Sequence, residues 1–216
     1  MLYQDSICEA LEVLPDSTEV FILTNGTIAP TSRLLLDARV VFCVSVYSSQ
    51  ASVHNRIVGA DSWAKVISNL YQMGSSNAKI ELRVVLGKHN CGHLAEFARF
   101  IAMNLPFLNQ VSWMGMELVE TAAINMDRLW VPLKQLVPQI LDAIEVLDAA
   151  EIPSLVYNFP LCLFSPSVRA RVRKTISSWK VRFLPSCVNC KLTDQCGGFF
   201  MSNVSVIEER EVYEYE

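Results

Sequence analysis

The stretch that decides the fold is KIELRVVL, residues 79–86. Alternate residues of a β-strand face opposite sides of a sheet, so the four aliphatic residues at even positions share one side, whereas Glu81 and Arg83 share the other. We expect the aliphatic side to lie under covering helices. A curved parallel sheet that holds a polar ligand on its inner face explains the charged side. The alternative is that Glu81 and Arg83 only pair with each other or lie on an exposed edge.

The preceding strand-like run, RVVFCVSVY at 39–47, shows the same division. Its apolar residues alternate with Cys43 and Ser45, which we place on the same side of the sheet as Arg83. Ligands of parallel sheets bind near the carboxyl ends of the strands. His54, just beyond this strand, is therefore a candidate ligand contact, and its alternative is an ordinary polar loop residue.

Outward from these two runs, extended and helical segments alternate along the chain. That rhythm is typical of βα units and predicts an α/β fold with a parallel sheet. A capping-box pair, Ser6 and Glu9, is expected to open the first helix. We expect strands at 19–24, 39–47, 79–86, 110–116 and 154–159, and helices at 6–14, 60–74, 93–105 and 131–150.

The composition describes a globular chain without a strong overall charge. Its 216 residues are 51% hydrophobic and 19% charged, with a net charge of -4, which gives no support for nucleic-acid binding. The most apolar run, at 34–47, contains Asp37 and Arg39 and is too short to span a membrane. The N-terminus carries no secretory signal. We therefore expect a cytoplasmic protein whose cysteines are reduced unless they hold a metal.

Three of the seven cysteines lie within ten residues, in the stretch CVNCKLTDQCGGFF. Cys187, Cys190 and Cys196 have the spacing C-x2-C-x5-C, and thiolates this close together outside a regular element usually converge on a metal. Cys162, just past the last expected strand, can supply a fourth ligand if a helix at about 166–179 returns the chain to it. Spacing alone leaves zinc, an iron–sulfur cluster and free thiols open.

A second cluster of metal-ligand types is weaker. The run KHNCGH brings His89, Cys91 and His93 within five residues, but this spacing matches no common zinc pattern. Its alternative is a turn before a helix in which Asn90 or Gly92 helps to cap. No G-x-S-x-G, G-x-G-x-x-G or P-loop motif occurs, which removes the usual hydrolase, dinucleotide and nucleoside-triphosphate interpretations.

The segment from VYNFPLC to CGGFF, residues 156–200, resembles the C-terminal cluster-binding segment of radical SAM enzymes. Within that superfamily it is most similar to the His-Xaa-Ser system radical SAM maturases, which modify a ribosomally made peptide. The stretches ILTNGT, VSVYSSQASVHNRIVGA, IELRVVLGKHN and VSWMGMELV occur in the order of the later barrel strands of that family. The resemblance therefore spans nearly the whole chain.

This resemblance implies a partial radical SAM-type (βα) barrel at 1–158, an auxiliary iron–sulfur cluster segment at 159–205 and a polar tail at 206–216. The family's C-x3-C-x2-C loop and the GGEP-like motif that follows it are absent from these 216 residues. About the first third of the barrel is therefore expected to be missing, as in a truncated or split reading frame or a fragment. We expect the chain alone to be inactive, because that loop binds the cluster that cleaves S-adenosylmethionine.

The resemblance also implies roles for particular residues. An auxiliary 4Fe-4S cluster is favoured over zinc as the occupant of the cysteine set. Ser45 and Arg83 are expected to face S-adenosylmethionine, and His54 or Glu117 the peptide substrate. The implied ligands of the cluster are Cys162, Cys187, Cys190 and Cys196.

Three functions remain open from the sequence. The first is the later part of a peptide maturase that acts with a partner maturase or a separate N-terminal half. The second is a non-catalytic remnant or partner subunit that binds peptide. The third is a zinc-stapled binding module, in which four thiolates only stabilise the C-terminal segment. We expect no nucleic acid or membrane partner in any of them.

Overall fold

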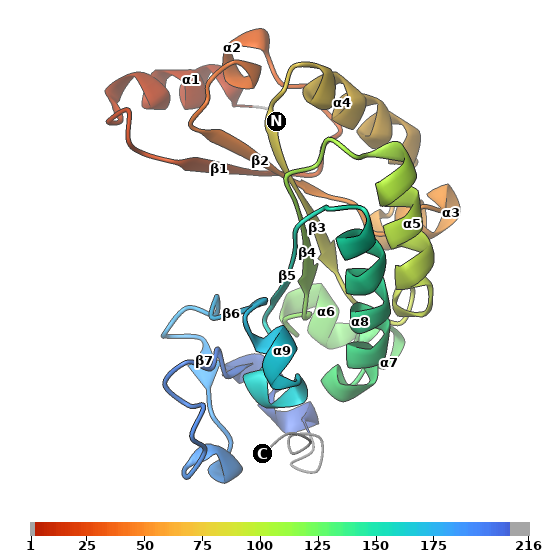
Figure 1. Ribbon diagram of the computed structural model, residues 1–216, viewed down its shortest axis with the longest axis vertical. Coiled ribbons are helices and arrows are strands. Elements are labelled where there is room, and N and C mark those ends of the chain that lie inside the picture. The colour runs from red at the N-terminus through yellow and green to blue at the C-terminus, as the bar shows by residue number, and fades with distance from the viewer. Residues whose placement is uncertain (1–2, 208–216) are drawn as a thin grey trace.

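A computed structural model describes residues 3–207 of the chain, in which a six-stranded sheet is the central element (Figure 1). All five strand pairs are parallel, and the spatial order β1 to β6 follows the order in the sequence. The strands are β1 (Val20–Thr24), β2 (Val40–Ser45), β3 (Lys79–Val85), β4 (Gln110–Met114), β5 (Ser154–Tyr157) and β6 (Val172–Arg173). The predicted α/β class and parallel sheet are confirmed.

Helices cover one face of this sheet. Figure 1 shows α4 (Trp63–Ser75), α5 (Leu94–Asn104) and α8 (Leu133–Ala149) along the same side of the strands. Beneath them Leu82 and Val84 of β3 are completely buried. Burial of these aliphatic side chains is the main favourable term that holds helices and sheet together.

The opposite face of the sheet carries the polar residues of β2 and β3. β1 and β6 are the two edge strands and do not pair with each other, so the sheet is open. On β1, the side chains of Phe21 and Leu23 are 50% and 67% exposed on this face. Glu81, Arg83 and Ser45 lie on the uncovered side of this open sheet, the side on which strand parity placed them.

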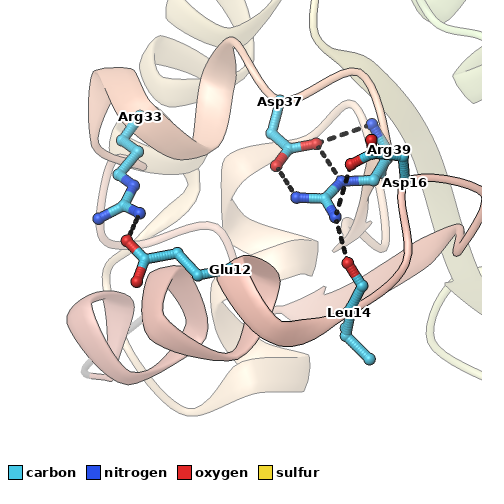
Figure 2. A network of polar contacts seen from close by, with 6 residues as sticks. All are labelled: Glu12, Leu14, Asp16, Arg33, Asp37 and Arg39. Carbon is cyan, nitrogen blue, oxygen red and sulfur yellow. Dashed lines mark hydrogen bonds and ion pairs between the residues drawn. The ribbon is translucent and has the colours of Figure 1, made fainter.

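A polar network lies beside the start of β2 and joins it to Leu14, the residue that follows the first helix (Figure 2). The Arg39 guanidinium donates to both carboxylate oxygens of Asp37, at 3.0 and 2.8 Å, and to the carbonyl oxygen of Leu14 at 3.1 Å. A second pair, Arg33 with Glu12, joins the two helices beside it. These contacts fix the loop that carries the chain from β1 to β2.

The remaining elements are short. They are α1 (Gln4–Val13), α2 (Ser32–Leu35), α3 (Ala51–Val58), α6 (Glu120–Ile124), α7 (Met126–Leu129), α9 (Pro166–Arg169), an antiparallel pair of β7 (Val181–Arg182) and β8 (Phe199–Phe200), and four 3₁₀ turns, Cys91–His93, Leu161–Leu163, Pro185–Cys187 and Met201–Val206. No helix within residues 3–207 is long and apolar enough to cross a membrane.

Two local predictions are wrong. The capping box does not form, because α1 begins at Gln4, before Ser6, and has no side-chain cap. The helix expected at 166–179 is only the four residues of α9, after which β6 joins the main sheet beside β5. Val172 of β6 is 8% exposed, so its burial favours the extended form. The segment expected at 159–205, here called the cysteine segment, thus contributes a strand to the main sheet.

Candidate cysteine-lined site and open sheet face

All four cysteines of the predicted set line one cavity of about 610 Å³. Cys162 lies in the 3₁₀ turn that follows β5, and Cys187 ends the 3₁₀ turn that follows β7. Cys190 and Cys196 follow in the next turns of the chain. Residues separated by up to 34 positions are therefore brought around one space, without the long helix that the sequence predicted.

Short hydrogen-bonded turns place the last three cysteines. The backbone N–H of Cys190 donates to the carbonyl oxygen of Cys187 at 3.1 Å. The Thr193 hydroxyl donates to the carbonyl oxygens of both residues, at 3.1 and 2.8 Å. The N–H of Cys196 donates to the carbonyl oxygen of Leu192 at 2.9 Å. The loop is thus organised by its own backbone.

The sulfur of Cys196 is the most enclosed of the set. The residue is 7% exposed, and its Sγ accepts backbone N–H groups from Leu161 and Gly198, both at 3.4 Å. The sulfur is therefore held by the backbone of two different turns. The bond from Leu161 also joins the loop to the turn that holds Cys162.

Gly198 has a backbone conformation that only glycine adopts easily. Its φ is +64°, and a Cβ added there would lie 2.7 Å from Val181 Cγ2 and 2.8 Å from the carbonyl oxygen of Arg182. A Cβ at the neighbouring Gly197 would meet nothing closer than 3.4 Å. Glycine is therefore required at the second position of the pair, where the N–H is directed at Cys196.

We expect Gly198→Ala to destabilise the cysteine segment by about 1–3 kcal/mol, from the left-handed φ and the two close contacts. Limited proteolysis should then cut between β6 and β8 at a lower protease concentration than in the parent protein. Gly92→Ala is the matched control, because a Cβ there meets nothing within 4 Å. Equal proteolytic resistance of the two variants would contradict this role of Gly198.

Burial disfavours the thiolate forms of two of the cavity cysteines. Burial, with a further contribution from the three other cysteines of the cavity, raises the pKa of Cys162 to about 12. Burial also raises the pKa of Cys187. Positive charge in the cavity favours the thiolate forms, and Lys191 lines the same cavity.

The cysteines are not arranged around a single ion. Within residues 3–207, no group of three or more His, Cys, Asp or Glu side chains is placed to hold one metal ion. A tetrahedral zinc site requires four sulfur atoms about 2.3 Å from one point.

Two contacts attach the cysteine segment to the carboxyl end of β4. The Asn203 side chain is 2% exposed; it accepts the N–H of Leu118 at 2.8 Å and donates to the carbonyl oxygen of Met116 at 2.8 Å. Lys180 Nζ lies 2.9 Å from Glu117 Oε2. The predicted peptide contact, Glu117, therefore lies where the sheet and the cysteine segment meet, and it is paired with a lysine.

A polar network occupies the uncovered face of the sheet. Arg83 donates to both carboxylate oxygens of Glu81, at 2.9 and 3.2 Å. Ser112 Oγ donates to Glu81 Oε1 at 2.7 Å, and Cys43 Sγ to Oε2 at 3.3 Å. Burial alone would raise the pKa of Glu81, but the hydrogen bonds from Arg83 and Ser112 lower it below its ordinary value. Glu81 is thus a buried, ionised carboxylate.

The Glu81–Arg83 pair forms, as the alternative interpretation predicted, while a ligand on this face stays a prediction. The two residues pair, and they do so on the open face, where the Arg83 side chain remains 23% exposed. Ser45 is aligned with Arg83 across the β2–β3 ladder and is half-buried. Sequence reasoning missed Ser112, which lies directly across from Arg83 on β4. The parity of QVSWM, applied as it was to the neighbouring strands, could have found it.

His54 and Asn90 have contacts that serve the fold. His54 is 1% exposed; its Nδ1 accepts the N–H of Tyr47 at 3.4 Å, and its Nε2 lies 3.3 Å from Ser62 Oγ. This burial leaves the ring no surface for a substrate. Asn90 holds its turn, because its side chain accepts the Gly87 N–H at 2.9 Å.

The comparison with known proteins rests on structure alone. No protein-family model matches the sequence, and no curated protein matches it. Streptococcus suis SuiB bound to S-adenosylmethionine has a similar structure, with a TM-score of 0.61 and 13% identity over 97% of this chain and 60% of that one.

Two further SuiB structures match over a smaller part of this chain. SuiB by itself has a TM-score of 0.53 at 13% identity, and SuiB bound to the precursor peptide SuiA has 0.54 at 14% identity; both cover 69% of this chain. This chain spans 34% and 33% of those chains. At these identities the likeness establishes a shared fold.

Proposed function

We propose that the chain is the C-terminal part of a radical SAM peptide maturase, and that its four cavity cysteines bind an auxiliary 4Fe-4S cluster. The observation that carries the proposal is the convergence of Cys162 with Cys187, Cys190 and Cys196 on one cavity beside an open parallel half-barrel. The fold shared with SuiB supports the barrel part, since SuiB binds S-adenosylmethionine and a precursor peptide.

The residues present fit an iron–sulfur cluster. Thiolates are its usual ligands, and backbone N–H groups directed at the sulfurs help to set its potential. Such a cluster would supply electron transfer or structural support. Cys196 would be its most protected ligand, because the N–H groups of Leu161 and Gly198 already point at its sulfur.

The open sheet face would bind S-adenosylmethionine. Glu81 engages Nε and Nη2 of Arg83 and holds the guanidinium in place, while the side chain stays partly exposed toward the uncovered side. A guanidinium held in this way can donate to the carboxylate of S-adenosylmethionine. Ser45, in register with Arg83, adds a hydroxyl to the same face.

The substrate would be a ribosomally made peptide, as in the His-Xaa-Ser system maturases that the sequence resembles. It would bind where β4 meets the cysteine segment, near Glu117. Cleavage of S-adenosylmethionine would require the C-x3-C-x2-C loop, supplied by a partner maturase or a separate N-terminal half. A non-catalytic subunit that only binds peptide is the second candidate.

The activity test uses the chain reconstituted anaerobically with iron and sulfide. With S-adenosylmethionine and dithionite it is expected to form no 5'-deoxyadenosine, because none of its cysteines has the loop spacing. Chromatography of the quenched reaction measures this product, with a complete radical SAM enzyme as positive control. Formation of 5'-deoxyadenosine in amounts that scale with the chain would contradict the proposed inactivity.

Binding of S-adenosylmethionine separates the maturase from a zinc-stapled module. Equilibrium dialysis should detect binding to the parent chain and at least tenfold weaker binding to Ser45→Ala combined with Arg83→Lys. Lysine keeps the charge but cannot form the two parallel bonds to Glu81. Equal binding by both proteins, or none by the parent, would argue against this face as the cofactor site.

A further inference from the structure

The chain has a small net charge, but its positive and negative residues are unevenly distributed along the sequence. Residues 152–193 contain seven of the 18 Lys and Arg residues and none of the 22 Asp and Glu residues. The rest of the chain is correspondingly acidic. This basic stretch contains β6, β7 and three of the four cavity cysteines, so the positive charge is concentrated in the part that forms the candidate site.

Four of these seven cations form what we call the basic surface, consisting of Arg173, Lys174, Arg182 and Lys191. All four are exposed. The backbones of Lys174 and Arg182 both pack against the consecutive glycines Gly197 and Gly198. A Cβ added to Gly197 would lie 3.4 Å from Lys174 Cα, and one added to Gly198 would lie 2.8 Å from the carbonyl oxygen of Arg182.

The other two members extend the same surface. Arg173 precedes Lys174 at the end of β6, across from Tyr157, which lies on the open side of the sheet. Lys191 lines the cysteine cavity. The basic surface therefore runs from the sheet edge to the mouth of the cavity.

Asp194 is the acidic residue nearest in the sequence to the basic surface, and it forms no ion pair with any of the four cations. Other cations of the stretch have partners: Arg171 pairs with Asp148 at 2.9 Å, and Lys180 with Glu117 at 2.9 Å. The four members of the basic surface form no ion pair with a described acidic residue. Their contacts are with backbone carbonyl oxygens, as where Lys174 Nζ lies 3.3 Å from the carbonyl oxygen of Asp194.

Exposed apolar side chains accompany the charge. Trp179 and Phe183, which flank β7, are 68% and 39% exposed, and Phe183 also lines the cysteine cavity. Unpaired cations beside exposed aromatic rings can bind both the carboxylates and the apolar side chains of an extended peptide.

We propose that the basic surface binds an acidic segment, rich in Asp and Glu, of the peptide that the chain acts on or carries. The identification of this partner as a substrate rests on the proposed function. Binding itself depends on neither cluster nor S-adenosylmethionine. The basic surface would hold the acidic segment at the sheet edge and place the adjoining residues of the peptide at the mouth of the cavity.

A short acidic peptide fits better than a nucleic acid. A single nucleic-acid strand carries a negative charge about every 3.4 Å and would extend from the basic surface over the acidic remainder of the chain, which repels it. A peptide can confine its carboxylates to the few residues that meet the four cations. We therefore expect a single-stranded oligonucleotide to bind more weakly than the acidic peptide.

The test measures fluorescence anisotropy of a labelled 15-residue peptide of alternating Glu and Gly with one central Phe. The full chain should bind it, with an affinity that falls as salt rises. Neutralising Arg173, Lys174, Arg182 and Lys191 to Gln should weaken binding on the order of tenfold or more, because each exposed ion pair contributes modestly. The matched control neutralises Arg56, Lys65, Arg99 and Arg128, which are also exposed but lie on α3, α4, α5 and α7.

Equal affinities of the two quadruple variants would overturn the proposal, as would tighter binding of a single-stranded oligonucleotide or of anionic vesicles than of the peptide. Since the assay needs no cluster, peptide binding without iron uptake would refute the proposed function alone. Iron uptake without peptide binding would refute this inference alone.

Discussion

Replacing Cys162 with Ala is expected to remove most of the iron from the reconstituted protein, about as much as Cys190→Ala removes. Cys162 comes from the turn after β5, far in sequence from the other three cysteines, yet it lines the same cavity. A cubane cluster with one thiolate removed is left with an open iron, which solvent and oxygen attack. Iron and sulfide analysis, with the visible absorbance of the cluster, measures the loss.

Cys91→Ala is the control for this experiment. Cys91 is also half-buried, but it lies in the turn before α5 and does not line the cavity. Its substitution should leave the iron content unchanged. Iron content that is indifferent to Cys162 would mean that the fourth ligand is water, another side chain or the substrate, and the cavity would then be a candidate for direct substrate binding.

The second large effect is expected from Arg83→Leu, which leaves the buried carboxylate of Glu81 without its cation. Removing one partner of a buried pair typically costs about 3–5 kcal/mol. The Arg83 side chain is 23% exposed, so we expect the free energy of unfolding to fall by about 3 kcal/mol, the lower end of that range. Urea unfolding at pH 7 measures it.

Two companion variants identify the cause. Glu81→Gln added to Arg83→Leu should restore a large part of the stability, because no charge is then buried. Arg39→Leu removes a pair of similar geometry (Figure 2) whose carboxylate is less buried, since Asp37 is 20% exposed and Glu81 5%, so its effect should be smaller. An equal loss for Arg39→Leu and Arg83→Leu would contradict the special cost of the buried carboxylate.

The dependence of this effect on pH follows from the lowered pKa of Glu81. A carboxyl group whose folded pKa is depressed contributes stability above its unfolded pKa and loses it as the pH falls through the folded value. In Arg83→Leu, burial favours the protonated form of Glu81 instead. The difference in stability between parent and variant should therefore shrink as the pH is lowered from 7 toward 4.

Periodicity predicted the sheet well because the alternation of apolar and polar residues within each strand reflects which of its faces is buried. The alternation in KIELRVVL identified the helix-covered side, and the completely buried Leu82 and Val84 lie there. The long helices were found for the same reason. The short strand β6 was missed, because two residues carry no periodic signal and its pairing with β5 is decided by tertiary contacts.

The site was only partly predictable. Spacing grouped Cys187, Cys190 and Cys196, since those residues are close in the chain. Cys162 was added from its place after a strand, and the helix expected to return the chain to it does not form as predicted. His54 was proposed from its place in the sequence, but burial depends on the packing of α3 against α4, which sequence position alone does not give.

The proposed cluster is tested most directly by the metal content of the chain after anaerobic reconstitution with iron, sulfide and zinc offered together. We predict close to four irons and four sulfides per chain, with the Mössbauer spectrum of a four-iron cluster and little zinc. One zinc per chain, with no iron or sulfide retained, would contradict this prediction and identify the four cysteines as a structural staple.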